Sequence, residues 1–512
     1  MSKEAREERQ EVRSSAPPAN GGAHDANPGG DGASKPAGSK SARPTMSGSA
    51  LRDKTEQARS TIAANSSGDL GEIEPKRRYA LHPSQTTGPN MPTWLRVPIL
   101  GPLRRVRRAR WWPYLALLGP GVVAASAGDD AGGIATYAQA GASYGYTLLW
   151  AMLVVTISLV LVQEMCARMG AVTGKGLSDL IREQFGVGWS LLAVGVLFVA
   201  NAGVTVSEFV GVAAAAGLVG IPGWVAVPPV AFLIWWSITK GSYKVVEKVF
   251  LLLSLVLFSY VIAAFLAKPP WGEVGAAFFK PTISFAPADL AVLVALIGTT
   301  ITPYMQLFVQ SGVVEKGVTP RDYKYTRFDT VFGAIFSDVV AAFIIIATAA
   351  TLFAQHIPIN SAADAAKALE PVAGTSATVL FALGLFGASV LAAGVLPLAT
   401  AYSVTESLGF EKGVSLSFSE APVFMGLFTA LVAGGALIAI IPGLPLFAVL
   451  LAVQVLNGSL LPILLVFIVK LASNKDIMGR YAIGPLYRVL AWASVVVIAV
   501  AVALMLVTLV IH

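Results

Sequence analysis

The sequence predicts an all-α integral membrane protein, and its composition and the spacing of its apolar runs support this. Of the 512 residues, 55% are hydrophobic and only 13% are charged. The charges gather in the first 110 residues and in a few short loops, and the rest of the chain is a series of apolar runs. A run of about 20 apolar residues crosses the hydrocarbon core as a helix. A soluble protein of this length would instead need amphipathic helices and far more surface charge.

Residues 1–110 are expected to form a disordered, basic cytoplasmic tail and juxtamembrane segment. The tail is rich in small, polar and charged residues, as in GGAHDANPGGDGASKPAGSKSARP. Such a composition cannot bury enough apolar area to fold alone, and we expect no secretory signal peptide. The net charge of +7 does not indicate nucleic-acid binding, because the basic residues flank the apolar runs. The single cysteine, Cys166, allows no intrachain disulfide and is expected to be a packed side chain.

The long apolar runs predict eleven transmembrane helices. Helices 1–5 (residues 111–267) and 6–10 (residues 286–471) would form two repeats, and helix 11 (residues 486–511) would be an addition. The expected limits of the eleven helices are 113–140, 146–170, 188–217, 222–239, 243–267, 286–315, 325–355, 373–407, 420–441, 445–471 and 486–511.

The distribution of Lys and Arg predicts which side of the membrane each loop faces. Basic residues stand before the first span, in GPLRRVRRARWWP, and after the second, sixth and tenth spans. The intervening loops QAGASYG, GIPG and IPGLP carry no Lys or Arg. Cytoplasmic loops carry the excess of Lys and Arg. We therefore expect a cytoplasmic N-terminus and, after eleven crossings, an extracellular C-terminus.

Two of the spans are interrupted at mid-depth by small or polar residues. Span 1 contains SAGDDAGG, and span 6 contains LIGTTITPYMQL, where Pro303 removes a backbone donor. Interrupted helices at matching places in two halves of a chain are typical of inverted-repeat transporters. Unwound backbone frees carbonyl groups, and the ends of half-helices supply dipoles. Carbonyls together with a carboxylate predict a cation site.

The carboxylates at this place are Asp129 and Asp130. Close helix packing would account for the neighbouring Gly128, Gly132 and Gly133, but it does not account for two adjacent acids. Ionisable residues at mid-membrane are costly and usually functional. We therefore expect Asp130 to bind a cation, whereas Asp129 is either a second ligand or a cap on the second half of the helix.

At these residues the chain resembles the NRAMP family of divalent metal transporters, over about residues 111–470. The resemblance implies a LeuT-like fold, a 5+5 inverted repeat in which metal binds where helices 1 and 6 are unwound. It includes the break of span 6 at Pro303, GPG at 119–121, IATYAQAGA at 134–142, ARMGAVTGKGLSDLIREQFG at 167–186, SEFVG at 207–211 and QVLNGSLLP at 454–462.

The chain departs from the family pattern in helix 1. The family motif there is Asp-Pro-Gly-Asn, and this chain reads Asp130, Ala131, Gly132 and Gly133. The metal-binding aspartate therefore remains, the ligand asparagine has become Gly133, and Asp129 is an additional carboxylate.

A second departure lies in helix 6, where the family's Met-Pro-His reads Thr302, Pro303 and Tyr304. A thioether ligand has thus become a hydroxyl. Sulfur ligands favour softer transition metals, whereas carboxylate, carbonyl and water suit Mg²⁺, which keeps several of its waters. The changes predict a wider, wetter and more anionic site, and they resemble the NRAMP-related magnesium transporters, a prokaryotic branch of the family.

The resemblance implies further ligands from the Ala127 and Thr299 backbone carbonyls and from Gln454 on helix 10. Gln454 is equally suited to an interhelical hydrogen bond. The complete set of expected metal-site residues is Asp130, Asp129, Gly133, Ala127, Thr299, Thr302 and Gln454.

Much of the ionisable network that couples familiar family members to protons is missing from this chain. The helix 6 histidine is Tyr304, and an Asp–Glu pair on helix 3 reads Thr205 and Glu208. The arginines expected at the start of helix 9 are absent from SFSEAPVFMG. We expect Tyr304, Thr205 and Glu208 to lie along the pathway, although Glu208 is equally suited to accept a structural hydrogen bond. Transport is therefore expected to be uncoupled from protons.

The sequence thus predicts a secondary transporter that takes up Mg²⁺, and also Mn²⁺, by alternating access, driven by the membrane potential and the concentration gradient. The alternative within the family is a proton-coupled Mn²⁺/Fe²⁺ importer. A sodium-coupled amino-acid carrier is disfavoured, because two aspartates would repel a substrate carboxylate. We expect neither a sensor nor an enzyme, because no signalling domain, nucleotide loop or nucleophile–base set is present. We expect a monomer in a prokaryotic cytoplasmic membrane, with no cofactor and no nucleic-acid partner.

Overall fold

The computed structural model describes most of the chain after residue 129. Within those ranges every regular element is a helix and there is no strand, which confirms the predicted all-α class. The predictions for the N-terminal tail, Ala127 and Asp129 fall outside them. The described residues are 130–240, 255–411, 413 and 416–511.

Eight stretches of the described chain are long and apolar enough to cross a membrane, counting α13 with α14 as one, and the apolar α9 is shorter. The first part of the chain forms α5 (Ala131–Tyr144), α6 (Leu149–Thr173), α7 (Leu177–Phe185), α8 (Val187–Leu218), α9 (Gly223–Thr239), η5 (Leu255–Phe258), α11 (Ser259–Leu266) and α12 (Trp271–Ala277). The second part forms α13 (Pro287–Thr300), α14 (Pro303–Glu315), α15 (Tyr323–Thr351), η6 (Phe353–Gln355), α16 (Ala362–Ala366), η7 (Lys367–Leu369), α17 (Glu370–Ala373), η8 (Gly374–Ser376), α18 (Ala377–Leu408), α19 (Pro422–Ala439), α20 (Leu446–Ser473), α21 (Lys475–Met478), η9 (Gly479–Tyr481) and α22 (Pro485–Ile511).

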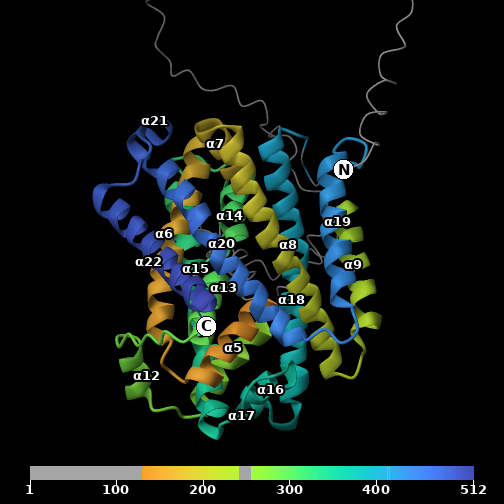
Figure 1. Ribbon diagram of the computed structural model, residues 1–512. Coiled ribbons are helices and arrows are strands. Elements are labelled where there is room, and N and C mark those ends of the chain that lie inside the picture. The colour runs from red at the N-terminus through yellow and green to blue at the C-terminus, as the bar shows by residue number, and fades with distance from the viewer. Residues whose placement is uncertain (1–129, 241–254, 412, 414–415, 512) are drawn as a thin grey trace, which may run out of the picture. The chain divides into compact units, whose positions relative to one another are not determined.

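The long helices follow the predicted spans closely, and α5 and α11 are the described parts of spans 1 and 5. Short helices between the spans, such as α7, were not predicted from the apolar runs. α7 is polar overall and buries only one face, formed by Leu177, Ser178, Leu180 and Ile181. It therefore lacks the continuous hydrophobicity that marks a span. Figure 1 shows α7 and α21 at one end of the bundle and α12, α16 and α17 at the other.

The predicted break in span 6 separates α13 from α14. α13 ends at Thr300, Ile301 leaves the helical region with φ −110° and ψ 62°, and Thr302 is extended. Pro303 opens α14 as its first residue. Proline disfavours the helical conformation for the residue before it, and its fixed φ suits the first position of a helix. The break therefore follows directly from the local sequence.

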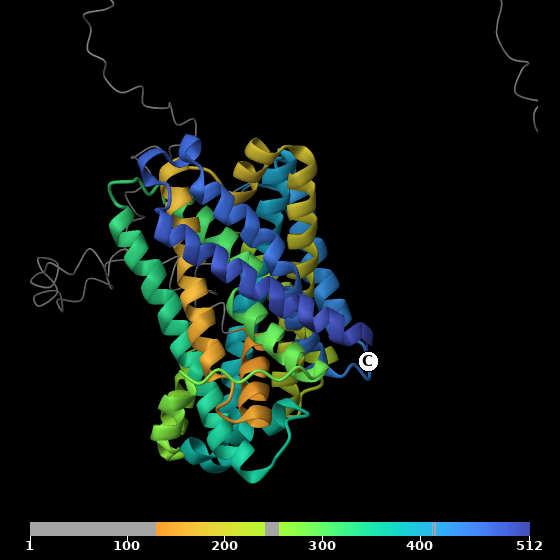
Figure 2. The ribbon, with the colours of Figure 1, turned by 60° about the vertical axis from the view of Figure 1, so that its left-hand side comes forward.

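Glycines let α13 and α20 pack backbone against backbone. A Cβ atom on Gly298 would lie 2.3 Å from the Gln454 carbonyl oxygen, and one on Gly458 would lie 2.3 Å from the Val294 carbonyl oxygen. Small residues are the usual means of close helix approach in membranes. α20 in turn runs beside α22, as both ribbon views show (Figures 1 and 2).

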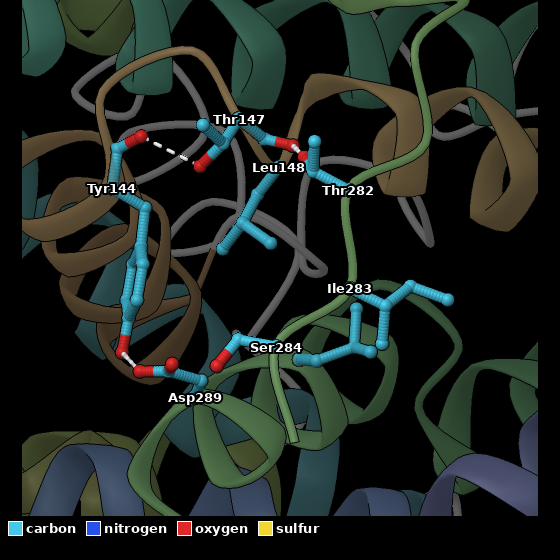
Figure 3. A pocket seen from close by; sticks show the side chains of 8 residues that line it. Tyr144, Thr147, Leu148, Thr282, Ile283, Ser284 and Asp289 are labelled. Carbon is cyan, nitrogen blue, oxygen red and sulfur yellow. Dashed lines mark hydrogen bonds between the residues drawn. The ribbon is translucent and has the colours of Figure 1, made fainter. Parts of the chain in front are cut away.

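Polar contacts join the beginnings of the two predicted repeats at the end of the bundle opposite α7. Figure 3 shows a small pocket of about 220 Å³ between the α5–α6 turn and the segment leading into α13. The Tyr144 hydroxyl donates to Asp289 Oδ1 at 2.7 Å, and the Thr282 hydroxyl donates to the Thr147 carbonyl at 3.1 Å. Asp289 therefore accepts a hydrogen bond from a tyrosine of the other predicted repeat. None of the predicted site residues lines the pocket.

The start of α22 is fixed by a polar cluster on α6. Tyr487 donates its hydroxyl to Glu164 Oε2 at 2.8 Å and to the Leu161 carbonyl at 2.9 Å. Glu164 also pairs with Arg168 at 2.6 Å and accepts a hydrogen bond from Tyr323 of α15. The cluster therefore anchors α22 to α6 and α15 at the end of the bundle that holds α7.

We expect Gly458→Ala to destabilise the bundle, because its methyl group would meet the α13 backbone. Overpacking of this kind costs about 1–3 kcal/mol. Thermal unfolding of the detergent-solubilised protein should show a lower midpoint for this variant. The control is Gly434→Ala on α19, where an added Cβ meets nothing within 4 Å. Equal midpoints for the two variants would contradict the close α13–α20 contact.

Candidate cation site

Asp130 is fully buried at the N-terminal end of α5, where it caps the helix. Its Oδ1 accepts a hydrogen bond from the Gly133 backbone N–H at 2.6 Å and a longer one from Gln454 Nε2 at 3.4 Å. Its Oδ2 is buried and has no hydrogen-bond partner among the described residues. An unsatisfied buried carboxylate oxygen is costly. One oxygen thus fixes the helix end, and the other is available to a cation.

The capping role that the sequence left open for Asp129 is therefore carried by Asp130. Asp129 and Ala127 lie outside the described residues, so their proposed roles as ligands stay predictions. The α5 N-terminus also presents the positive end of a helix dipole, which favours a carboxylate there. This capping role explains why an acidic residue precedes α5. It uses only Oδ1 of the carboxylate, and Oδ2 keeps no described partner.

Gln454 reaches from α20 to Asp130 across a glycine. A Cβ atom on Gly132 would lie only 2.0 Å from Gln454 Nε2, so a larger residue would displace the amide. Asn457, one turn further along α20, donates to the Gly298 carbonyl at 2.8 Å and makes a longer contact to Gln454 Oε1 at 3.4 Å. Gln454 therefore forms an interhelical hydrogen bond, and its role as a metal ligand stays a prediction.

Glu208 of α8 contacts Ala131, the residue that follows Asp130 in the sequence. Its Oε2 accepts a hydrogen bond from the Ala131 backbone N–H at 3.3 Å, and its Oε1 accepts from the Ser207 hydroxyl at 3.3 Å. Gly211, one turn along α8, permits this approach because a Cβ there would lie 2.4 Å from the Ala131 Cβ. Glu208 therefore does act as a hydrogen-bond acceptor, and it adds a second carboxylate to the start of α5.

The residues of the span 6 break are buried, and several of their oxygens lack partners. Thr299 and Thr302 are fully buried, and neither hydroxyl has a hydrogen-bond partner in the described part of the chain. Pro303 stands four residues after Thr299 and has no N–H to donate to its carbonyl. The Thr302 carbonyl accepts a long hydrogen bond from Gln306 at 3.4 Å. Two hydroxyl oxygens at the break thus lack described partners, and the role of the Thr299 carbonyl as a ligand stays a prediction.

A hydrogen bond joins the end of α13 to α5. The Tyr137 hydroxyl and the Thr300 hydroxyl lie 3.0 Å apart. Tyr304, in the first turn of α14, is fully buried. The Thr205 hydroxyl bonds within its own helix to the Asn201 carbonyl at 2.8 Å.

Some of the predicted site residues are hydrogen-bonded to Asp130 in the structure, and others are not. Asp130, Gly133 and Gln454 are in direct contact, and Glu208 joins them through Ala131. The hydroxyls of Thr299, Thr302 and Thr205 are buried on adjacent helices but are not hydrogen-bonded to Asp130. In the described ranges no group of three or more His, Cys, Asp or Glu side chains could hold a metal ion. A cation here would therefore rely on few charges and on neutral oxygens.

Two residues of this arrangement were not predicted as functional, Gly132 and Asn457. Asn457 stands three residues after Gln454, and such spacing places both on one face of a helix. That spacing was the available signal for Asn457. For Gly132 there was none, because the need for glycine arises from a side chain 322 residues later in the sequence.

Comparison with known proteins places the chain in a family. The family described as "Natural resistance-associated macrophage protein-like" (Nramp) matches residues 121–508. The divalent metal cation transporter MntH of Burkholderia ambifaria is 27% identical over 418 residues, which cover 78% of this chain and 91% of that protein. MntH of Klebsiella pneumoniae strain 342 is 29% identical over 397 residues, covering 75% and 92% of the two chains. These relatives are transporters rather than enzymes.

Solved structures show the same architecture. The manganese transporter of Eremococcus coleocola, in complex with an aromatic bis-isothiourea compound, is 20% identical with a TM-score of 0.64, over 77% of this chain and 86% of that one. MhsT, a LeuT-fold transporter solved with L-phenylalanine, is 14% identical with a TM-score of 0.50, over 78% and 98%. The predicted LeuT-like fold is thereby confirmed, and the family match over most of its length shows that the chain belongs to the Nramp family.

Proposed function

We propose that the protein takes up divalent metal cations across a prokaryotic cytoplasmic membrane by alternating access, with Mg²⁺ as its main substrate and Mn²⁺ as a second one. The observation that carries the proposal is the buried Asp130 Oδ2, which lacks a partner among the described residues. The MntH relatives, which are named divalent metal cation transporters, support the general class. The bilayer is the protein's environment, and the proposed orientation has the N-terminus in the cytoplasm.

The preference for Mg²⁺ rests on the kind of atoms that are free around Asp130. The buried oxygens without described partners on α5, α20 and the span 6 break include Asp130 Oδ2, Thr299 Oγ1, Thr302 Oγ1 and Asn457 Oδ1. Mg²⁺ selects oxygen ligands and retains several waters. The methionine of α14, Met305, instead accepts a hydrogen bond at its sulfur from Gln163 of α6 at 3.8 Å. These oxygen atoms, the free ones named among the described residues, support assignment to the magnesium-transporting branch of the family.

In the proposed site Asp130 is the principal ligand, and the small Gly133 leaves room for water where a longer side chain would stand. Asp129, Thr302, Gln454 and the carbonyls of Ala127 and Thr299 complete the set of contacts, some through water. A partly hydrated ion needs fewer direct protein ligands than a bare one.

Uptake is proposed to proceed without protons. Each charge that moves across the membrane gains about 2.3 kcal/mol per 100 mV. A divalent ion then gains roughly 4.6 kcal/mol, which corresponds to about a thousandfold accumulation. The neutral Thr205 and Tyr304 stand where proton-coupled relatives are expected to carry ionisable groups. The membrane potential alone is therefore a sufficient driving force.

The test is uptake by the full-length protein in liposomes with an imposed inside-negative potential. One set of liposomes contains a Mg²⁺-sensitive dye and a second set a pH dye. We expect Mg²⁺ uptake without acidification, and we expect Asp130→Ala to abolish it because the variant removes the only free carboxylate oxygen described at the site. Ser459→Ala, whose hydroxyl bonds only within α20, should transport normally. Acidification coupled to Mn²⁺ uptake, with no Mg²⁺ uptake, would instead identify an ordinary proton-coupled importer.

We expect Thr302→Met to shift the preference from Mg²⁺ towards Mn²⁺. The substitution places a soft thioether where a hydroxyl now stands, and softer ligands favour transition metals over Mg²⁺. The ratio of initial uptake rates for the two ions, measured in the same liposomes, reports the change. Thr302→Val is the matched control, since it removes the hydroxyl without adding sulfur. An unchanged ratio in Thr302→Met would refute the argument from ligand softness.

We expect Gly132→Ala to weaken metal binding by displacing the Gln454 amide from Asp130. The loss of a hydrogen bond to a charged group corresponds to about a tenfold or larger rise in the Kd. Titration calorimetry with Mg²⁺ and with Mn²⁺ measures it. In a Gln454→Ala background the glycine substitution should have little further effect, because the clash is gone. Additive losses in the double variant would show that the two residues act independently.

A further inference from the structure

A second cavity lies at the end of the bundle that holds α7, and none of the predicted site residues lines it. It has a volume of about 330 Å³, which is within the range of small-molecule sites. It opens where the end of α7, the end of α20 and the first turns of α22 meet. Its lining residues are Gln184, Phe185, Lys470, Leu471, Ser473, Asn474, Arg488 and Trp492.

The charge of this cavity is entirely positive. Lys470 and Arg488 line it, and no acidic residue is among the lining residues. Neither cation forms an ion pair or a side-chain hydrogen bond with any described residue, and Arg488 Nε is buried without an acceptor. A buried charged donor without a partner is costly. An anion with several acceptor oxygens would satisfy both cations at once.

Apolar residues close to Arg488 on α22 are exposed. Leu486 and Val489, which flank Arg488 on α22, are 74% and 65% exposed. Trp492 lines the cavity one turn further on, and Trp189 nearby packs edge-on against Phe467 of α20. Tryptophan gathers at the level of lipid headgroups. The cavity therefore lies where a headgroup could enter it while acyl chains lie along the exposed face of α22.

We propose that this cavity binds the phosphate headgroup of an anionic phospholipid from the leaflet on the α7 side of the membrane. Lys470 and Arg488 contact the phosphate, and Gln184, Asn474 and Ser473 provide polar contacts for the rest of the headgroup. Basic pockets between transmembrane helices at the cytoplasmic side are suited to this role. The bound lipid bridges α20 to α22 beside the Tyr487 anchor, and so stabilises the eleventh helix.

Native mass spectrometry of the delipidated full-length protein tests the proposal. The probes are phosphatidylglycerol and phosphatidylcholine with the same acyl chains. We expect the wild type to bind phosphatidylglycerol preferentially. Lys470→Gln/Arg488→Gln should weaken that binding roughly thirtyfold, since two basic contacts are lost. Phosphatidylglycerol should also raise the thermal midpoint of the wild type but not that of the double variant.

The control is Lys475→Gln/Arg480→Gln, which removes two exposed cations at the same end of the bundle but outside the cavity. It should bind as the wild type does. Arg488→Lys keeps the charge and should retain most of the binding, which tests the proposal even if the double variant folds poorly. Equal binding of the two lipids, or unchanged binding by the cavity variant, would overturn it. Displacement of phosphatidylglycerol by millimolar inorganic phosphate would assign the cavity to a soluble anion instead.

Discussion

The arrangement around α5 depends on one constraint, which is that a carboxylate buried inside a membrane protein must find donors within the protein. Asp130 meets it only because the helix begins at that point, so that the Gly133 N–H is not used by the helix itself. Glu208 uses the neighbouring Ala131 N–H in the same way. The start of α5 is thus where two acids, Asp130 and Glu208, are held close together.

This constraint extends outward through small residues. The Gln454 amide reaches Asp130 only because residue 132 is glycine, and α8 brings Glu208 to Ala131 only because residue 211 is glycine. α20 packs closely against α13 at Gly298 and Gly458. Asn457 of α20 adds a hydrogen bond to the Gly298 carbonyl. In a medium without a hydrophobic driving force between helices, such close contacts and interhelical hydrogen bonds maintain the geometry.

Local sequence was sufficient for the features that arise within one segment. The apolar runs predicted the described spans, and Pro303 predicted the break between α13 and α14, because each depends on residues a few positions apart. The predicted break in span 1 lies before the described residues. Gly132 and Asn457 could not be assigned in this way, since their roles depend on which face of α20 meets α5 and α13. The same reasoning explains why Gln454 and Glu208 were each left with two roles. Only the packing of helices distant in sequence shows their hydrogen bonds.

The proposed transport is also compatible with the small number of free ligand atoms among the described residues of the site. A transporter must release its ion on every cycle, and a cage of several carboxylates would hold a divalent cation too firmly for that. Asp130 contributes a single unpartnered oxygen, and the hydroxyls of Thr299 and Thr302 are neutral. Neutral oxygens can exchange with the waters that Mg²⁺ retains, so the ion need not lose its whole hydration shell. Coordination by neutral oxygens around Asp130 is thus consistent with an ion that is bound and released in every cycle of the proposed transport.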